Sequence, residues 1–405
     1  MDSSVSNSRK IAWMVWVVAS VFYAYQYIIR VMPNIMLDDI MQQFNISAAT
    51  FGQFSGFYYI GYSLVHIPVG ILLDRFGPRK VMTSCILLTV AGLTPLLFAS
   101  HWVYPIAGRF VIGVGSSAAI LGVFKIVRMT FSEARFARML SLSVTIGLLG
   151  AIYGGGPVSY MRELFGYSSV VQGMAIGGII LALLTYWIVP DMKREPAGAV
   201  TANIKEVLTN PKVIWTCIFA GLMVGPLEGF ADVWGTVFLK QVYGMEVTAA
   251  ASFASLIFIG MCFGGPVLSF VAEKVGTAAT IITAGICMAV SFVLLLSGSA
   301  SSGAISVGFV VVGVASAYQI LAIFKASTYV REEVAGLTTA VANMIIMIFG
   351  YAFHSSIGFV VNAMGGTAQT SALVIGVAVI PAALFIGTCG FIALFINDRK
   401  IKEKA

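Results

Sequence analysis

Three ionisable residues, Arg30, Glu228 and Asp232, stand inside long apolar stretches of the sequence. A charge within an apolar span costs about 2.5–3.5 kcal/mol on membrane-insertion scales, so such a residue faces a cavity or a partner. Arg30 offers a planar, permanently charged fork that suits a carboxylate. Glu228 and Asp232 are four residues apart and share one helix face. We expect these residues to bind a small charged molecule and to carry a proton. An Arg30–Glu228 ion pair with only a gating role is the alternative.

Other polar residues within apolar stretches are candidates for the same cavity. Tyr23, Tyr27 and Arg30 are spaced by four and three residues, so they share a helix face. This pattern favours a cavity lining, although Arg30 could instead extend its head group to the membrane interface. The remaining candidates for substrate binding are Lys125, Lys325, Asn343 and His354.

Several of these candidates have a plainer interpretation. Lys125 and Lys325 could contact the substrate, act as two arms of an inner gate, or reach the interface. A single histidine in an apolar span, such as His66 or His354, is more often a hydrogen-bonded packing residue than a proton relay. The sequence leaves these alternatives open.

The composition is that of a membrane protein. Hydrophobic residues make up 59% of the 405 residues and charged residues 10%, with a mean hydropathy of +0.94. A soluble domain of this length would need far more surface charge. The net charge of +7 does not indicate a nucleic-acid partner, because the positive residues lie in short loops and tails. Without a metal-ligand cluster, a P-loop or a nucleophile motif, we expect neither an enzyme nor a cofactor.

Apolar runs of about twenty residues predict an all-α membrane protein with twelve spans. Polar residues 190–212 divide the chain into an N-terminal half, 1–189, a cytoplasmic linker, 190–212, and a C-terminal half, 213–405. The predicted spans are 11–36, 49–73, 81–99, 102–128, 139–161, 169–189, 213–238, 248–271, 278–297, 303–328, 335–361 and 370–396.

Positive charge predicts the orientation of these spans. With both termini in the cytoplasm, 18 of the 24 Lys and Arg residues fall in cytoplasmic segments. The reverse orientation would place those 18 outside, against the positive-inside rule. We therefore expect a multi-pass protein of a bacterial inner membrane with both termini cytoplasmic.

The two halves contain a direct repeat. Residues 110–125 (FVIGVGSSAAILGVFK) align with residues 310–325 (VVVGVASAYQILAIFK), matching Gly113 with Gly313 and Lys125 with Lys325. Identity between apolar helices is common by chance, but a matched lysine in each is not. The repeat predicts two pseudo-symmetric six-helix halves related by an axis along the membrane normal.

The loop after the second predicted span carries a specific pattern. Residues 70–80 read GILLDRFGPRK, and this D-R-x-G-x-R-K pattern resembles the loop between helices 2 and 3 of the major facilitator superfamily. We expect Gly70 to let another helix approach closely, and Asp74 to accept hydrogen bonds from arginines or a helix N-terminus. The matching residues are Gly70, Asp74, Arg75, Gly77, Arg79 and Lys80.

A second pattern, R-x-x-x-G-x-G from Arg109 to Gly115 with Gly113 as its first glycine, is similar to one in helix 4 of that superfamily. We expect Arg109 near the outer mouth, where the family's arginine supports packing or proton transfer. The resemblance covers the whole chain. It implies a secondary transporter that binds its substrate near the midplane, between the halves, and works by alternating access.

The segment AYQYIIRV around Arg30 looks like the first helix of organophosphate and organic-anion transporters, where an arginine grips the anionic group. The organophosphate antiporters have a second arginine where this sequence has Glu228. That departure disfavours a dianionic phosphate ester. It favours a zwitterion, with its carboxylate on Arg30 and its amine on Glu228.

We therefore expect a proton-coupled importer of a small polar anionic or zwitterionic metabolite, such as an amino acid, short peptide or organic acid. Glu228 and Asp232 are the candidates for proton coupling. Anionic-metabolite transporters and phagosomal nutrient transporters of bacteria are the nearest resemblance. The expected partners are the substrate, protons and the lipid bilayer, and the protein is expected to be a monomer. The alternatives are a drug or siderophore exporter of the same superfamily and a non-transporting membrane sensor.

Overall fold

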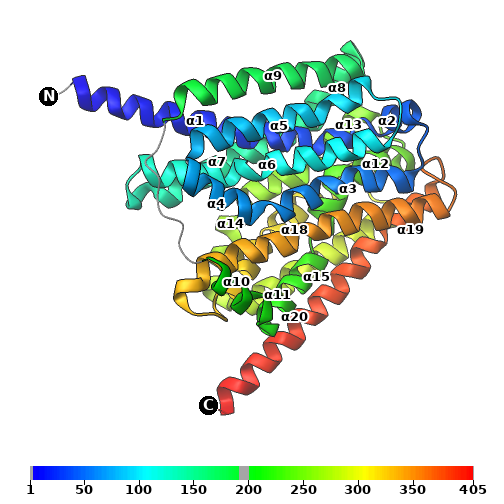
Figure 1. Cartoon of the computed structure of the whole chain (residues 1–405). Helices are drawn as coiled ribbons and strands as arrows, with labels where there is room; N and C mark the ends of the chain where they lie inside the picture. The colour runs from blue at the N-terminus through cyan, green and yellow to red at the C-terminus, as the bar shows by residue number, and fades with distance from the viewer. Residues whose placement is uncertain (1–2, 191–199, 405) are drawn as a thin grey trace.

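The computed structural model describes residues 3–190 and 200–404, and the secondary structure of this part of the chain is entirely helical (Figure 1). In the described part of the chain, eleven helical segments are long and apolar enough to cross a membrane. The bent pair α3 (Ala48–Leu64) and α4 (His66–Phe76) can be counted as a twelfth span. The expectation of an all-α membrane protein is confirmed.

The elements of the N-terminal half are α1 (Ser3–Val31), the 3-10 turn η1 (Met32–Asn34), α2 (Leu37–Phe44), α3, α4, α5 (Pro78–Phe98), α6 (Val103–Thr130), α7 (Glu133–Gly154), α8 (Gly156–Phe165) and α9 (Tyr167–Ile188). Those of the C-terminal half are α11 (Pro211–Leu222), the π-helix η2 (Gly225–Trp234), α12 (Gly235–Tyr243), α13 (Val247–Ala254), α14 (Leu256–Val275), α15 (Thr277–Leu296), α16 (Ser302–Ser316), α17 (Tyr318–Ser327), α18 (Glu332–Ala363), α19 (Thr370–Val377) and α20 (Val379–Lys404). The predicted linker lies partly outside the described residues, and its described part contains α10 (Val200–Thr209).

Several predicted spans are broken rather than continuous, and prolines account for four of the breaks. A proline has no N–H and its ring clashes with the carbonyl four residues earlier, so a helix tends to end there. The helices α3, α11 and α19 each end four residues before a proline, and α7 ends three residues before one. The prolines are Pro68, Pro226, Pro381 and Pro157. The first of these breaks bends the second span by 48° between α3 and α4.

Matched glycines bring helix backbones into contact at equivalent places in the two halves. A Cβ added to Gly113 would lie 2.0 Å from the carbonyl oxygen of Tyr58, and one added to Gly313 would lie 2.0 Å from that of Ile257. No side chain fits at these distances, so α6 packs on α3 and α16 packs on α14 through bare backbone. The repeat seen in the sequence therefore has a counterpart in the packing of each half.

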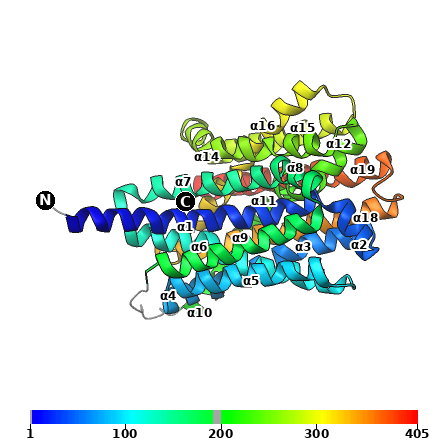
Figure 2. The same cartoon turned by 90° about the horizontal axis from the view of Figure 1, so that it is seen from above.

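Both chain termini lie on one side of the molecule, called here the terminal side, and the opposite side is called distal (Figure 1). Seen from above, α1 lies along α6, α7 and α9 (Figure 2). The halves meet through α3 and α18, where Gly52 faces the carbonyl of His354 and Gly358 faces that of Ala48. Toward the terminal side the helices of the two halves diverge (Figure 1).

The expectation that Gly70 allows a close helix approach is wrong for this conformation. A Cβ added to Gly70 would meet no atom within 4 Å. Gly70 lies in α4, beyond the 48° bend, and α4 lies on the terminal side, where the helices of the two halves diverge (Figure 1). Gly336 of α18 is equally open. Both glycines therefore remain available for contacts in a different arrangement of the halves.

These two environments predict opposite effects of adding one methyl group. Gly113→Ala would push the added Cβ against the backbone of α3, so we expect a loss of about 1–3 kcal/mol of stability, as for other overpacked sites. Gly70→Ala is the matched control, and it should be neutral or stabilise α4 by up to about 1 kcal/mol. Thermal unfolding of the purified variants measures both effects, and equal melting temperatures would contradict the backbone contact at Gly113.

Candidate functional site

The three charges singled out in the sequence form one buried cluster between the halves. Arg30 lies one residue before the end of α1, and its Nε donates to Asp232 Oδ2 at 2.6 Å. Its Nη2 donates to Glu228 Oε2. The exposed fractions are 6% for Arg30, 2% for Glu228 and 0% for Asp232. One guanidinium from the N-terminal half therefore binds two carboxyl groups from the C-terminal half.

The two carboxyl groups project from the π-helix η2, which sits between α11 and α12 within the seventh predicted span. Pro226 near its start removes a backbone donor and ends α11 at Leu222. Glu228 and Asp232 are four residues apart, close to one turn, so both side chains reach Arg30. Segments with π geometry are rare and occur often at functional sites.

Tyr59 of α3 completes the cluster and was missed by the sequence analysis. Its hydroxyl lies within hydrogen-bond distance of both Glu228 Oε2 and Asp232 Oδ2. A phenol has a single proton to donate, so it can serve only one carboxylate. Its contact with the second carboxyl group is favourable if that group carries a proton and donates to the phenol oxygen. The geometry therefore suits one shared proton.

Aromatic rings surround the guanidinium of Arg30. Its Cζ lies 4.9 Å from the ring centroid of Tyr27 and 5.3 Å from that of Tyr59, within the range of cation–π attraction. The rings of Tyr23 and Tyr27 are 5.2 Å apart. The face predicted from the spacing of Tyr23, Tyr27 and Arg30 therefore exists, and both tyrosines are half-buried along it.

His354 and Asn343, both on α18, have different surroundings. His354 is 1% exposed, and its Nε2 faces the backbone carbonyl of Glu228. Its ring packs edge-on against Tyr59 at 5.3 Å. Asn343 interacts with the hydroxyl of Tyr62 on α3. His354 thus supports the acidic pair from behind, whereas Asn343 belongs to a neighbouring polar contact.

Arg109 holds the end of α1 in place. It donates from Nη1 to the carbonyl of Ile29 at 2.9 Å and from Nη2 to the carbonyl of Arg30 at 3.2 Å. These carbonyls belong to the last turn of α1, where backbone acceptors lack helical partners. Arg109 is only 1% exposed, so it is a buried support for Arg30, and its expected place near the outer mouth stays a prediction.

Lys125 and Lys325 lie away from this cluster, each in an ion pair within its own half. Lys125 Nζ lies 2.9 Å from Asp74 Oδ1, and Lys325 Nζ lies 2.9 Å from Asp398 Oδ2. The partner of Asp74 is thus a lysine, not the expected arginine or helix N-terminus. Lys125 is sixteen residues beyond Arg109 on α6, about 24 Å along the helix. In this conformation Lys125 is paired with Asp74 and lies outside the cluster around Arg30, so its role in substrate binding stays a prediction.

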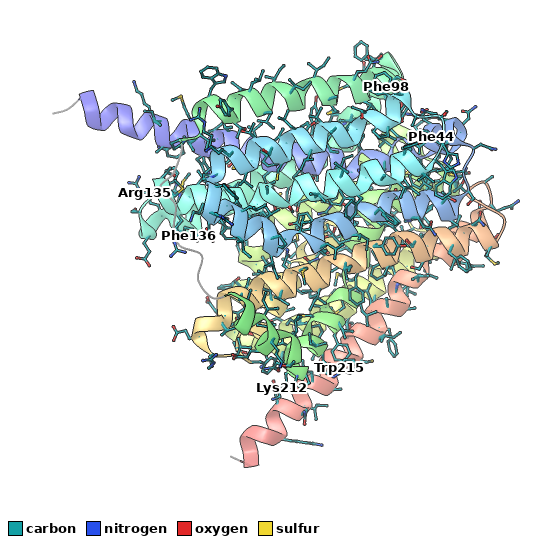
Figure 3. The ribbon with its side chains drawn as sticks, in the orientation of Figure 1. Phe44, Phe98, Arg135, Phe136, Lys212 and Trp215 are labelled. Atoms are coloured by element: carbon teal, nitrogen blue, oxygen red, sulfur yellow. The ribbon has the colours of Figure 1, made fainter. Side chains whose placement is uncertain are left out.

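Further polar contacts tie the terminal side of the C-terminal half together. Lys212 of α11 donates to Asp398 at 2.8 Å, and Trp215 follows one turn later (Figure 3). Outside the spans, Arg331 donates two hydrogen bonds to Glu206 of α10, at 3.2 and 2.6 Å. These bonds lower the pKa of the Glu206 carboxyl group. One ion pair attaches α11 to the C-terminal helix α20, and the other attaches the start of α18 to the linker helix α10.

The loop between α4 and α5 uses a glycine where the backbone requires one. Gly77 has φ +80°, a conformation that L side chains rarely adopt, and Gly276 at the equivalent loop of the second half has φ +89°. Arg79 stacks over the ring of Tyr186 at 4.3 Å, and Arg75 over Phe76 at 5.3 Å. The contact of Arg79 therefore packs this loop against α9 of its own half.

The distal side is closed by contacts between the halves. Lys240 donates to Asp38 at 2.8 Å, and Thr248 donates to Glu163 at 2.6 Å. The Lys240–Asp38 contact borders a small polar cavity of about 140 Å³, whose lining includes Asn34, Asp38, Arg162, Thr236 and Lys240. An apolar hollow of about 80 Å³ between α15 and α16 contains no charged residue. Among the described residues, no group of three or more His, Cys, Asp or Glu could hold a metal ion.

Comparison with known proteins identifies the family. The model of the Major Facilitator Superfamily matches residues 15–354. The chain belongs to this superfamily. The expectation based on the loop at residues 70–80 is confirmed, and the protein is thereby grouped with membrane transporters.

Curated members of the superfamily and solved structures show distant similarity. NicT of Pseudomonas putida, named as a metabolite transport protein, is 25% identical over 45% of this chain and 43% of its own length. GudP of Bacillus subtilis, a probable galactarate/D-glucarate transporter, is 24% identical over 88% of this chain and 86% of its own. A variant of the nucleoside transporter NupG has a TM-score of 0.80 at 14% identity, covering 94% of this chain and all of that one. The match to NupG concerns the fold alone.

Two of the residues missed by the sequence analysis had a signal in the sequence. Tyr58, Tyr59, Tyr62 and His66 place polar tips along one apolar span, which is unusual for a helix facing lipid alone. Asn34 follows Arg30 by one helical turn and is 3% exposed. Neither pattern tells which residue of the other half it contacts, because that depends on how the halves are arranged.

Removal of Arg30 should test the charge balance of the cluster. Arg30→Gln would leave two buried carboxyl groups without their cation, so we expect a loss of about 3–5 kcal/mol of stability. The triple variant Arg30→Gln, Glu228→Gln, Asp232→Asn removes all three charges and should recover most of the lost stability. Thermal unfolding decides this, and a triple variant no more stable than Arg30→Gln would contradict the charge-balance argument.

Proposed function

We propose that this member of the major facilitator superfamily is a proton-coupled importer of small organic acids, which uses Arg30 to bind the substrate carboxylate. The observation that carries the proposal is the sharing of one buried guanidinium by two carboxyl groups at the junction of the halves. A small-molecule carboxylate is the chemical equivalent of those groups. It can take the place of one of them on Arg30 with the same fork geometry.

Proton coupling follows from competition for Arg30. With Glu228 and Asp232 both ionised, a third negative charge at Arg30 would be repelled. Protonation of one carboxyl group removes a negative charge and releases part of the guanidinium for the substrate. Proton and substrate therefore favour each other's binding, which is the requirement for symport. The single donor of Tyr59 supports the same conclusion, because its two contacts are best satisfied with one proton shared.

The substrate class is argued from the charge of the site and from the relatives. GudP is named for two sugar acids, which are small hydroxylated carboxylates. Tyr23, Tyr27 and Tyr59 line the approach to Arg30 and could bond such hydroxyl groups. Glu228 adds an anchor for an amine, so amino acids are the second class to be tested.

We also propose that the terminal side is cytoplasmic, as the excess of Lys and Arg in its loops and tails favours. The contacts Lys240–Asp38 and Thr248–Glu163 would then close the periplasmic side, and the diverging helices would face the cytoplasm. This arrangement corresponds to an inward-facing state of an alternating-access cycle. An inner-membrane location and a monomer complete the proposal.

A transport assay tests the proposal directly. Purified protein in proteoliposomes should accumulate a radiolabelled sugar acid or hydroxy acid when the outside is made acidic, and collapse of the pH gradient should release it. An amino-acid panel under the same gradient separates the two substrate classes. Accumulation of neither class under a pH gradient would contradict a proton-coupled importer.

Glu228→Gln should separate binding from coupling. The neutral amide keeps a hydrogen bond to Arg30 but cannot titrate, so exchange of substrate across the membrane should continue while pH-driven accumulation falls at least tenfold. Glu163→Gln, an acid of the distal side outside the cluster, is the matched control and should keep coupling. Arg30→Lys should lose most binding, because an ammonium lacks the planar fork. Wild-type accumulation by Glu228→Gln would move the coupling role to Asp232.

Asp74→Asn should alter the rate more than the affinity. Asp74 is half exposed and pairs with Lys125, about 24 Å along α6 from Arg109, so it does not contact a substrate bound to Arg30. We expect a several-fold slower transport rate with substrate affinity within about twofold, because the change acts on the equilibrium between conformations. Equal losses of affinity and of rate would show that this ion pair has no separate conformational role.

A further inference from the structure

The side chain of Asn34 from the N-terminal half is inserted into the backbone of η2 and α12 in the C-terminal half. Its Nδ2 donates to the carbonyl oxygen of Ala231 at 3.0 Å. Its Oδ1 accepts from the backbone N–H of Thr236 at 3.1 Å. Asn34 is 3% exposed, so both bonds are formed away from water. A carboxamide has one acceptor and one donor group, and each has a partner here.

The two backbone groups bound by Asn34, the carbonyl of Ala231 and the N–H of Thr236, are those that the next hydrogen bond of the π-helix would join. The N–H of Gly235 bonds to the carbonyl of Phe230, five residues earlier, as π geometry requires. The following bond of that type would join the N–H of Thr236 to the carbonyl of Ala231. Asn34 occupies both groups instead, at the point where η2 ends and α12 begins. An amide from the other half therefore binds both backbone groups that the next π-type hydrogen bond would join, at the point where the helix geometry changes.

We propose that Asn34 is a positioning residue that fixes the register of η2 and thereby aims Glu228 and Asp232 at Arg30. Ala231 directly precedes Asp232 in the chain, so a bond that fixes the carbonyl of Ala231 also fixes the orientation of the Asp232 backbone and thus the direction of its side chain. A change of register by one residue rotates the following side chains by about 100° around a helix. Such a rotation would remove one carboxyl group from Arg30. The register itself is independent of the proposed transport activity, whereas its consequence for proton coupling rests on that activity.

The same short segment of the N-terminal half supplies both the cation and the amide. Arg30 and Asn34 lie one turn apart across the end of α1 and η1, so they move together. Separation of the halves on the distal side would withdraw the guanidinium from the acidic pair and the amide from the helix in one step. Release of the carboxyl groups is thereby coupled to loss of the π register.

Amide hydrogen exchange on the purified, full-length protein in nanodiscs tests the register. Asn34→Leu keeps the volume of the side chain but removes both bonds, so we expect exchange in residues 225–243 to rise about tenfold. Thr236→Val is the matched control. The Thr236 hydroxyl has no partner among the described residues, and its backbone N–H is kept, so exchange should remain unchanged. Unchanged exchange in Asn34→Leu would overturn the proposal whether or not the protein transports organic acids.

A second readout separates positioning from simple stabilisation. The pH profile of proteoliposome uptake should shift in Asn34→Leu and stay unchanged in Thr236→Val, since only the former disturbs the alignment of the acidic pair. Neither substitution changes the titratable groups around that pair, which are Arg30 and Tyr27 from α1, Tyr59 from α3, Arg109 from α6, Tyr318 from α17 and His354 from α18.

Hydrogen exchange and the pH profile of uptake, measured together on Asn34→Leu, decide whether Asn34 is a positioning residue. Faster exchange with a shifted pH profile supports it, and faster exchange with the wild-type profile overturns it. If Asn34→Leu does not fold, Asn34→Ala removes the same two bonds with a smaller side chain. Its exchange should also rise about tenfold, and an exchange rate equal to wild type would contradict the inserted amide.

Discussion

The balance of charge around Arg30 is the constraint on which the rest of the structure depends. A guanidinium and two carboxyl groups lie at most 6% exposed, in surroundings where an unpaired charge is costly. Supporting contacts approach the cluster from several helices. Arg109 binds the backbone carbonyls at the end of α1, and His354 binds the backbone carbonyl of Glu228. The hydroxyl of Tyr59 lies between the two acids. Because the cation belongs to one half and the acids to the other, the cluster also holds the halves together.

Much of this arrangement could be predicted from the sequence because charges in apolar spans have few solutions. Arg30, Glu228 and Asp232 are the residues for which insertion into a membrane is most costly, and their mutual contact lowers that cost. The membrane spans and the repeat follow from hydropathy and from matched glycines. The breaks in the spans could also have been predicted, since Pro68, Pro226 and Pro381 each stand four residues after the end of a helix.

Other features could not be predicted because they depend on the arrangement of the two halves. Nothing in the neighbourhood of Tyr59 in the sequence indicates that its hydroxyl meets two acids of η2. Asn34 looks like an ordinary polar residue at the end of a span until its backbone partners are known. Gly70 has the residue type for a close helix contact, but that contact is absent in this arrangement, in which the helices of the two halves diverge toward the terminal side (Figure 1).

The backbone contacts at Gly113 and Gly313 have a mechanical consequence. A helix interface made of side chains can yield as rotamers change, but one in which a Cβ would lie 2.0 Å from a carbonyl oxygen has nothing that can yield. Each of the helix pairs α3–α6 and α14–α16 should therefore move as a rigid unit within its half. Bending of the helices should instead occur at the breaks that prolines cause at the ends of α3, α7, α11 and α19, where the backbone hydrogen bonding is interrupted. Glycine and proline together divide each half into parts that resist strain and parts that absorb it.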